Sequence, residues 1–370
     1  MLLLLIAGVL CADSLMLASH VALGHTIAEF SRYGDAPEFL SNAQVFGASG
    51  PHFPGYGWFL YMMNALTARA INPVILAVGV NIVCQVLSAC LLYRLARIEH
   101  LEADKAILAA GLMTCFPFQS LFLTVLPLSD ALKLLLVTSA FYCHKKNNAF
   151  MTILLTAALV STRNVFVLMA LGLSFYYLME RNWRPLLLST VAYLPAVLFV
   201  LYQYLVTGNA LHYINVEGPD QPLVSVPLFF LIDLVRQGPA GVASVLYQLP
   251  FLFLIFAYAF RLWRDRDIFA LCYCGPLIGF LISCDVVWAY SIISRYLAFL
   301  VPFVLPMYRD FLQKRFVFSK GAFRKSFAGY VVLVSSATLL YSLINFPESN
   351  FPLFFSAMMS RLRLWLSPGW

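Results

Sequence analysis

Two carboxylates lie close together in residues 29–58, the long polar stretch in the front half of the chain. Asp35 and Glu38 are three residues apart, and His52 and an aromatic-proline turn that includes Tyr56 follow. A carboxylate within hydrogen-bond reach of a hydroxyl can take its proton as a general base. Because Ala36-Pro37 is typical of a helix start, an N-cap role for Asp35 is an alternative that can coexist with catalysis.

Glu38 could assist Asp35 or help to bind a metal. Asp35-x-x-Glu38 alone does not specify a metal site, so no cofactor is expected, although a divalent cation stays open. Four aromatic residues, Tyr56, Trp58, Tyr213 and Trp288, could stack on the ring of a ligand, but membrane proteins place Trp and Tyr at interfaces in any case. Of these aromatic residues, only Tyr56 is kept as a candidate ligand residue.

A second group of charged residues lies at the predicted ends of apolar helices: Asp130, Lys133, Arg163 and Arg295. Charges near hydrocarbon are costly and usually have a partner or a task. One interpretation is mutual pairing, of Asp130 with Lys133, which share a helix face, and of Arg295 with Asp285. The other is a cationic cup for a phosphate, because Arg forks and Lys charges suit phosphoryl oxygens.

The elements that must position these side chains are membrane helices. Of the 370 residues, 62% are hydrophobic and only 11% are charged, and apolar runs of roughly 17–25 residues match the length of a bilayer-spanning helix. Sustained two-residue alternation, the mark of strands, is missing from the sequence. We therefore predict one all-α domain over residues 1–370, a polytopic membrane helix bundle of about eleven transmembrane helices.

The predicted spans are separated by two large polar loops, 25–70 and 207–240. The first carries an amphipathic interfacial helix over 59–69, and the second ends in a Phe-rich surface helix that reaches Arg236. The tail 350–370 is either interfacial or a further span. The spans are predicted at about 2–22, 73–92, 106–123, 128–143, 149–161, 165–179, 186–206, 241–260, 268–284, 292–307 and 328–345.

Charge placement predicts the orientation of this bundle. Two thirds of the 24 Lys and Arg residues fall in the links 94–105, 144–148, 181–185, 261–267 and 309–325. Short basic links are typical of the cytoplasmic face, so the net charge of +7 is an orientation signal and nucleic acid is not an expected partner. The two polar loops then face outward. The absence of Asn-x-Ser/Thr sequons is in keeping with a bacterial protein, and we expect a multi-pass protein of the bacterial inner membrane.

Short motifs that include Gly34-Asp35, Phe53-Pro54-x-Tyr56 and Thr162-Arg163-Asn164 follow one another along the chain. Their order resembles that in the polytopic glycosyltransferases of the GT-C fold. Among these enzymes, the chain is most similar to the mannosyltransferase that adds the second mannose of GPI anchors and to its bacterial relatives. Two positions depart from that pattern: Asp130 replaces the usual Glu, and Gly57 stands where a second Pro is common. The motifs, which cover about residues 30–165 and a patch near 295, are Gly34-Asp35, Phe53-Pro54-x-Tyr56, Phe116-Pro117, Leu128-Ser129-Asp130-Ala131-Leu132, Thr162-Arg163-Asn164 and Arg295-Tyr296 before Pro302.

This resemblance implies transfer of a sugar, with mannose as one candidate, from a polyprenyl-phosphate-sugar donor at the outer face of the membrane. The acceptor hydroxyl would belong to a glycan, a lipid or a protein. The first-loop acid of the family is its proposed catalytic base, which corresponds to Asp35. The candidate substrate-binding residues are Glu38, His52, Tyr56, Asp130, Lys133, Arg163 and Arg295.

Other functions stay open at this level. A lipid-linked-sugar transporter or flippase would also be polytopic, but it should show repeated halves with broken helices near the membrane midplane. The sequence has no convincing internal repeat. A polysaccharide polymerase or ligase would share the outward loops and the phosphate cup, but it usually depends on Arg and His in a large late loop. A relative that has lost its activity is a further alternative.

Overall fold

The computed structural model describes residues 2–22, 35–45, 53–114, 126–210, 229–236, 254–283 and 298–305. Every regular element in these ranges is a helix, which confirms the all-α prediction for this part of the chain. The predicted span 328–345, the basic link 309–325 and the tail 350–370 lie outside the described residues. So do residues 211–228 and 237–250 of the second polar loop and its surroundings.

The helices follow the predicted order. The first half contains α1 (Leu2–Ala22), α3 (Ala36–Gln44), α4 (Gly55–Leu66), α5 (Pro73–Ile98), α6 (Ala103–Thr114), α8 (Asp130–Lys145) and α9 (Ala149–Thr162). The second half contains η2 (Asn164–Phe166), α10 (Val167–Met179), α11 (Trp183–Leu188), η3 (Ser189–Tyr193), α12 (Leu194–Thr207), α14 (Phe229–Arg236), α16 (Ile268–Ile282) and η4 (Ala298–Leu300). Residues 254–265 and 301–305 are also helical.

Polar residues before the apolar runs start several of these helices. The side chain of Asn72 accepts a hydrogen bond from the Val74 amide at 2.9 Å, and Pro73 occupies the first helical turn of α5. Asn148 caps α9 and Asp267 caps α16 in the same way. Each cap satisfies a backbone N–H group that has no partner within its own helix. These local signals explain why the starts of α5, α9 and α16 follow the sequence closely.

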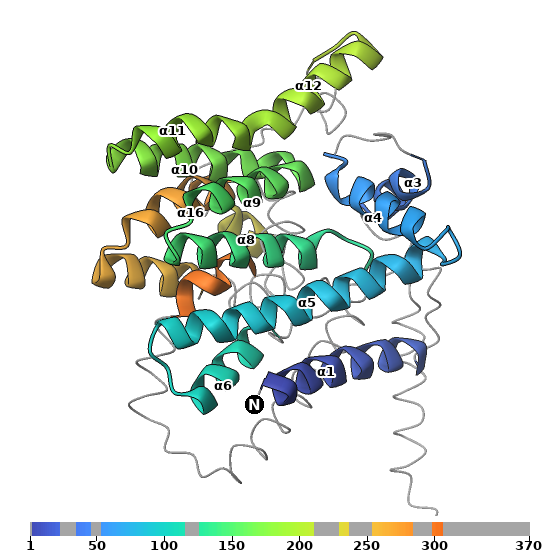
Figure 1. Ribbon diagram of the computed structural model, residues 1–370, viewed down its shortest axis with the longest axis horizontal. Helices are drawn as coiled ribbons and strands as arrows, with labels where there is room; N and C mark the ends of the chain where they lie inside the picture. Colours follow the sequence, from blue (N-terminus) through green and yellow to red (C-terminus); the bar gives the residue numbers. More distant parts are fainter. Residues whose placement is uncertain are drawn as a thin grey trace, which may run out of the picture.

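The long helices lie side by side, and the short helices α3 and α4 lie at one end of them (Figure 1). Helix α5 packs against α1 and α8, α8 packs against α9, and α10 packs against α16. Short connections between successive helices produce this antiparallel arrangement. Asp35, the residue before α3, therefore lies at one end of the bundle.

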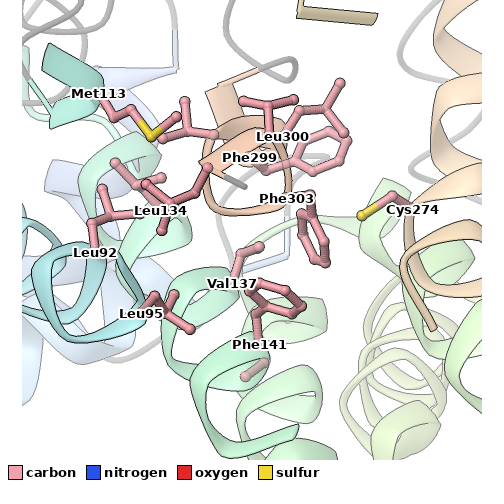
Figure 2. Packing of buried hydrophobic residues seen from close by; sticks show 14 of the residues in the cluster. Leu92, Leu95, Met113, Leu134, Val137, Phe141, Cys274, Phe299, Leu300 and Phe303 are labelled. Atoms are coloured by element: carbon pink, nitrogen blue, oxygen red, sulfur yellow. The ribbon is translucent and has the colours of Figure 1, made fainter. Parts of the chain in front are cut away.

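The interior of the bundle is an apolar core (Figure 2). The centroid of the Phe141 ring lies 4.5 Å from that of Phe303, so the segment 298–305 packs directly on α8. Buried contacts of this kind join helices that are far apart in the sequence and hold their ends in fixed positions. The labelled members of the cluster are Leu92, Leu95, Met113, Leu134, Val137, Phe141, Cys274, Phe299, Leu300 and Phe303.

Several of the predicted basic links meet at the other end of the bundle. Lys145, at the end of α8, forms an ion pair with Glu99, just after α5, at 3.1 Å. The ring of His144 stacks on Phe269 of α16 at a centroid distance of 3.5 Å and contacts Tyr176 of α10 edge-on. Because α8 has 16 residues, it separates this end from the end near α3 by roughly 24 Å.

Two helices in the described ranges are long and apolar enough to cross a membrane: α5, and the continuous helical segment Trp183–Thr207 formed by α11, η3 and α12. Helices α9, α10 and α16 are apolar but shorter. Large apolar side chains such as Leu187, Leu201 and Leu205 are exposed along the segment Trp183–Thr207. Eleven spans stay a prediction, because several of them fall partly or wholly outside the described residues.

Several predicted boundaries are wrong, and the helix that contains residues 254–265 also continues past its predicted end at 260. Helix α5 continues to Ile98 instead of ending near Leu92, so Arg94 and Arg97 belong to its last turns rather than to the following link. Helix α4 begins at Gly55, four residues before the predicted start of the interfacial helix. Arg is a good helix former, and a Pro before a helix is compatible with its start.

Candidate functional site

The side chain of Asp35 forms an ion pair with the guanidinium group of Arg163. Asp35 occupies the N-cap position of α3, as the sequence predicts, but its side chain makes no capping hydrogen bond. The Asp35 side chain is 18% exposed and that of Arg163 is 7% exposed. The Asp35 carboxylate therefore pairs with a residue distant in the sequence instead of capping α3. Asp35 is the more exposed of the two partners.

Close backbone packing brings these two segments together. Gly55, the first residue of α4, lies so close to Ser161 that an added Cβ would overlap the Ser161 carbonyl and hydroxyl oxygens. Arg163 follows two residues later, with extended backbone at the end of α9. A Cβ on Gly57 would lie 2.5 Å from the Asn42 Cβ of α3. Glycines at these two positions let α4 contact both α9 and α3, so the ends carrying Asp35 and Arg163 meet.

Tyr56, the residue after Gly55 in α4, is part of the core. Its side chain is fully buried, its ring meets Phe39 edge-on at 5.2 Å, and its hydroxyl donates to Asn81 Oδ1 at 3.0 Å. Burial raises the Tyr56 pKa well above its usual value, and the nearby Cys84 and Asp130 add to the effect. Tyr56 therefore stabilises the packing of α4 near the site. Because its ring is fully buried, the ring has no exposed face that could stack on a sugar.

Asp130 and Lys133 form a second ion pair at the start of α8. Lys133 Nζ lies 2.6 Å from Asp130 Oδ1, and the two side chains are 5% and 3% exposed. Of the two interpretations of these charges, mutual pairing is therefore the one observed for Asp130 and Lys133. Lys133 Nζ also lies 6.0 Å from the centroid of the Phe166 ring, and the Phe166 amide donates to the Arg163 carbonyl oxygen at 3.2 Å. The two ion pairs are therefore neighbours across the start of η2.

Six of the eight predicted site residues are described, and five of them gather where α3, α4, α8 and α9 meet: Asp35, Tyr56, Asp130, Lys133 and Arg163. The sixth, Glu38, is partly buried in the first turn of α3. His52 and Arg295 lie outside the described residues, as does Asp285. In the described part of the chain, no three His, Cys, Asp or Glu side chains are grouped closely enough to hold a metal ion.

The sequence analysis missed the role of Asn81. Its amide nitrogen donates to the Leu126 carbonyl oxygen at 2.7 Å while its oxygen accepts from Tyr56, so one fully buried side chain ties α5 to α4 and to the segment before α8. The signal was present in the apolar run of α5. Asn81, Gln85 and Ser88 are spaced by four and three residues and so share one helix face, and all three are fully buried.

The chain matches no protein-family model and no curated protein sequence. The resemblance to GT-C glycosyltransferases therefore rests on the ordered motifs alone. The structure gives a physical reason for one departure from the family pattern. A proline ring at position 57 would extend from α4 into Asn42 of α3, so this packing requires a residue without a side chain.

Proposed function

We propose that this protein is a membrane glycosyltransferase that moves a sugar from a polyprenyl-phosphate-sugar donor to an acceptor hydroxyl. The observation that carries the proposal is the ion pair between Asp35 and Arg163. It joins a carboxylate suited to remove a proton to a cation suited to bind a phosphate. Both residues belong to motifs of the GT-C resemblance, Gly34-Asp35 and Thr162-Arg163-Asn164.

The proposed reaction needs both groups. The acceptor oxygen forms a bond to the anomeric carbon of the sugar as the bond from that carbon to the phosphate oxygen breaks, through an oxocarbenium-like transition state. The hydroxyl proton passes to the carboxylate of Asp35, and the electron pair of the broken bond stays on the polyprenyl phosphate. Arg163 stabilises the charge that develops on this leaving group.

Lys133 has a different proposed role from Arg163. Its ammonium group is buried with Asp130, and a buried cation separated from the acid that it pairs with would leave an uncompensated charge. We therefore assign the Asp130–Lys133 pair to positioning the start of α8 beside η2. Arg163 is the described cation that we assign to the phosphate, and Arg295 and His52 stay candidates from the sequence.

The proposed orientation places the Asp35 end of a bundle of about eleven spans at the outer face of a bacterial inner membrane. Two observations support it. The links near Glu99, Lys145 and Tyr176 meet at the opposite end, which matches the predicted cytoplasmic collection of basic links. Apolar side chains also point outward along the segment Trp183–Thr207, as expected for a helix in contact with lipid.

The direct test supplies candidate donors to the purified full-length protein. Polyprenyl-phosphate mannose and polyprenyl-phosphate glucose are incubated with protein in lipid nanodiscs and with membrane glycan extracts as acceptors. The release of polyprenyl phosphate is then measured by mass spectrometry. The proposal expects acceptor-dependent release with one of the donors. It fails if the sugar–phosphate bond of every donor stays intact while a flippase assay with the protein reconstituted in vesicles shows lipid movement.

A further inference from the structure

The ion pair between Asp35 and Arg163 poses a difficulty for the chemistry just described. A guanidinium group stabilises the charged form of a carboxylate and opposes its protonation. The same guanidinium group cannot make its full set of hydrogen bonds to a phosphate while its NH2 end contacts Asp35. The observed contact therefore holds both groups away from their proposed tasks.

We propose that this ion pair is the donor-free state of the site, and that the phosphodiester of a polyprenyl-phosphate-sugar donor displaces Asp35 from Arg163. The inference rests on the proposed function and adds an order of events to it. The phosphate binds first and takes over Arg163. Asp35 is thereby released to accept the acceptor proton. A site without donor then holds a weak base, which suppresses unwanted proton transfer.

The geometry permits this exchange. The Asp35 side chain is 18% exposed and Arg163 is 7% exposed, so the acid lies on the open side of the pair and the cation on the buried side. The acid is the first residue before α3, where its side chain is not used as a cap. It can turn away from Arg163 without breaking a helix cap. The backbone two residues before Arg163 is held by close packing at the end of α9, where Gly55 lies against Ser161.

The charges favour the exchange as well. The donor phosphodiester carries one negative charge, like Asp35, and presents two oxygens that match the guanidinium fork. The departing polyprenyl phosphate is a monoester with up to two charges near pH 7. Arg163 therefore binds the leaving group more strongly than the donor, and Asp35, protonated after the transfer, no longer competes for it. When the phosphate leaves and Asp35 loses its proton, the pair forms again.

The test measures binding without turnover. Full-length protein in detergent micelles is titrated with undecaprenyl phosphate, for the wild type, Asp35→Asn, Arg163→Gln and Glu99→Gln. Asp35→Asn removes the competitor, so undecaprenyl phosphate should bind about fivefold more tightly, which is the fold-change expected from a partly exposed ion pair. Arg163→Gln should weaken binding at least tenfold. Glu99→Gln is a matched control, because Glu99 is 16% exposed and paired with Lys145 at the opposite end of the bundle.

Unchanged or weaker binding in Asp35→Asn would overturn the exchange, because it would mean that the acid only holds Arg163 in position. Equal binding of inorganic phosphate and undecaprenyl phosphate would overturn the assignment to a lipid. A second measurement needs no variant: carbodiimide labelling of Asp35 in the wild type, followed by mass spectrometry, should rise when undecaprenyl phosphate is added. A constant labelling rate would contradict the release of Asp35.

These outcomes separate the exchange from the proposed function. Weaker binding in Asp35→Asn together with sugar transfer by the wild type would remove the exchange and keep the transferase. Tighter binding in Asp35→Asn together with no transfer from any donor would keep the exchange at a phosphate-binding site and remove the transferase.

Discussion

The buried ion pair between Asp130 and Lys133 gives a prediction whose size can be worked out from the structure. At a separation of 2.6 Å, Coulomb's law gives an attraction of roughly 6 kcal/mol for an effective dielectric constant of about 20. Much of this attraction is offset by the removal of both charges from water. Removal of one partner leaves the other charge buried, which costs about 3–5 kcal/mol. Replacement of both partners removes the uncompensated charge.

The assay is a double-mutant cycle on the free energy of unfolding. Asp130→Asn, Lys133→Met and the double variant keep side-chain volume while removing charge. Unfolding is followed by circular dichroism during titration of dodecyl maltoside micelles with sodium dodecyl sulfate. We expect each single variant to lose about 3–5 kcal/mol and the double variant to lose less than either single variant. Additive losses would refute the argument that the two charges chiefly compensate each other, and would return Lys133 to the set of phosphate-binding candidates.

Two further predictions concern the elements around the site, and a third concerns the opposite end of the bundle. Gly55→Val should lower the free energy of unfolding by about 2 kcal/mol, because its side chain meets Ser161. The control Gly79→Ala, which has nothing within 4 Å of the added Cβ, should raise the free energy of unfolding by about 0.5–1 kcal/mol. If Gly55→Val and Gly79→Ala changed this free energy equally, the close approach of α4 and α9 would be contradicted. Asn81→Leu should lower the free energy of unfolding by about 2–4 kcal/mol, because the Tyr56 hydroxyl and the Leu126 carbonyl oxygen lose their hydrogen bonds. An unchanged free energy of unfolding would contradict a stabilising role of Asn81 between α5, α4 and the segment before α8. Burial lowers the His144 pKa from 6.5 to about 4, with Asp267 opposing and Lys145 adding to the shift. Between pH 4 and 6.5 the unfolded chain therefore binds more protons at His144 than the folded chain does. The free energy of unfolding should fall as the pH falls from 6.5 to 4. His144→Phe should remove this dependence on pH.

Local patterns in the sequence predicted most of the described helices. Apolar runs with a polar cap before them, as at Asn72, Asn148 and Asp267, define where a helix can start without reference to the rest of the fold. The end of α5 at Ile98 was harder to predict, because Arg94 suits both a helix and a charged link. The start of α4 at Gly55 was hidden by a Pro-Gly sequence that is equally typical of a turn.

The site was predictable only in part. The three-residue spacing of Asp130 and Lys133 made their pairing on α8 one of two alternatives, and the structure shows this pair. The pair of Asp35 and Arg163 depends on α4 packing against both α3 and α9, and no local spacing contains that information. The complete burial of Tyr56 could not be predicted either, because an aromatic residue beside Pro and Gly suits a membrane interface as well as a core.

The measurement that tests the account most directly is the rate of sugar transfer by Asp35→Asn. The variant and the wild type are assayed at equal membrane levels with the same polyprenyl-phosphate sugar, and Glu99→Gln serves as the matched control. Because a positioned general base contributes about 10²–10⁴-fold, we expect the Asp35→Asn rate to fall by that factor while the Glu99→Gln rate stays at the wild-type value. A wild-type rate in Asp35→Asn would contradict the assignment of Asp35 as the base.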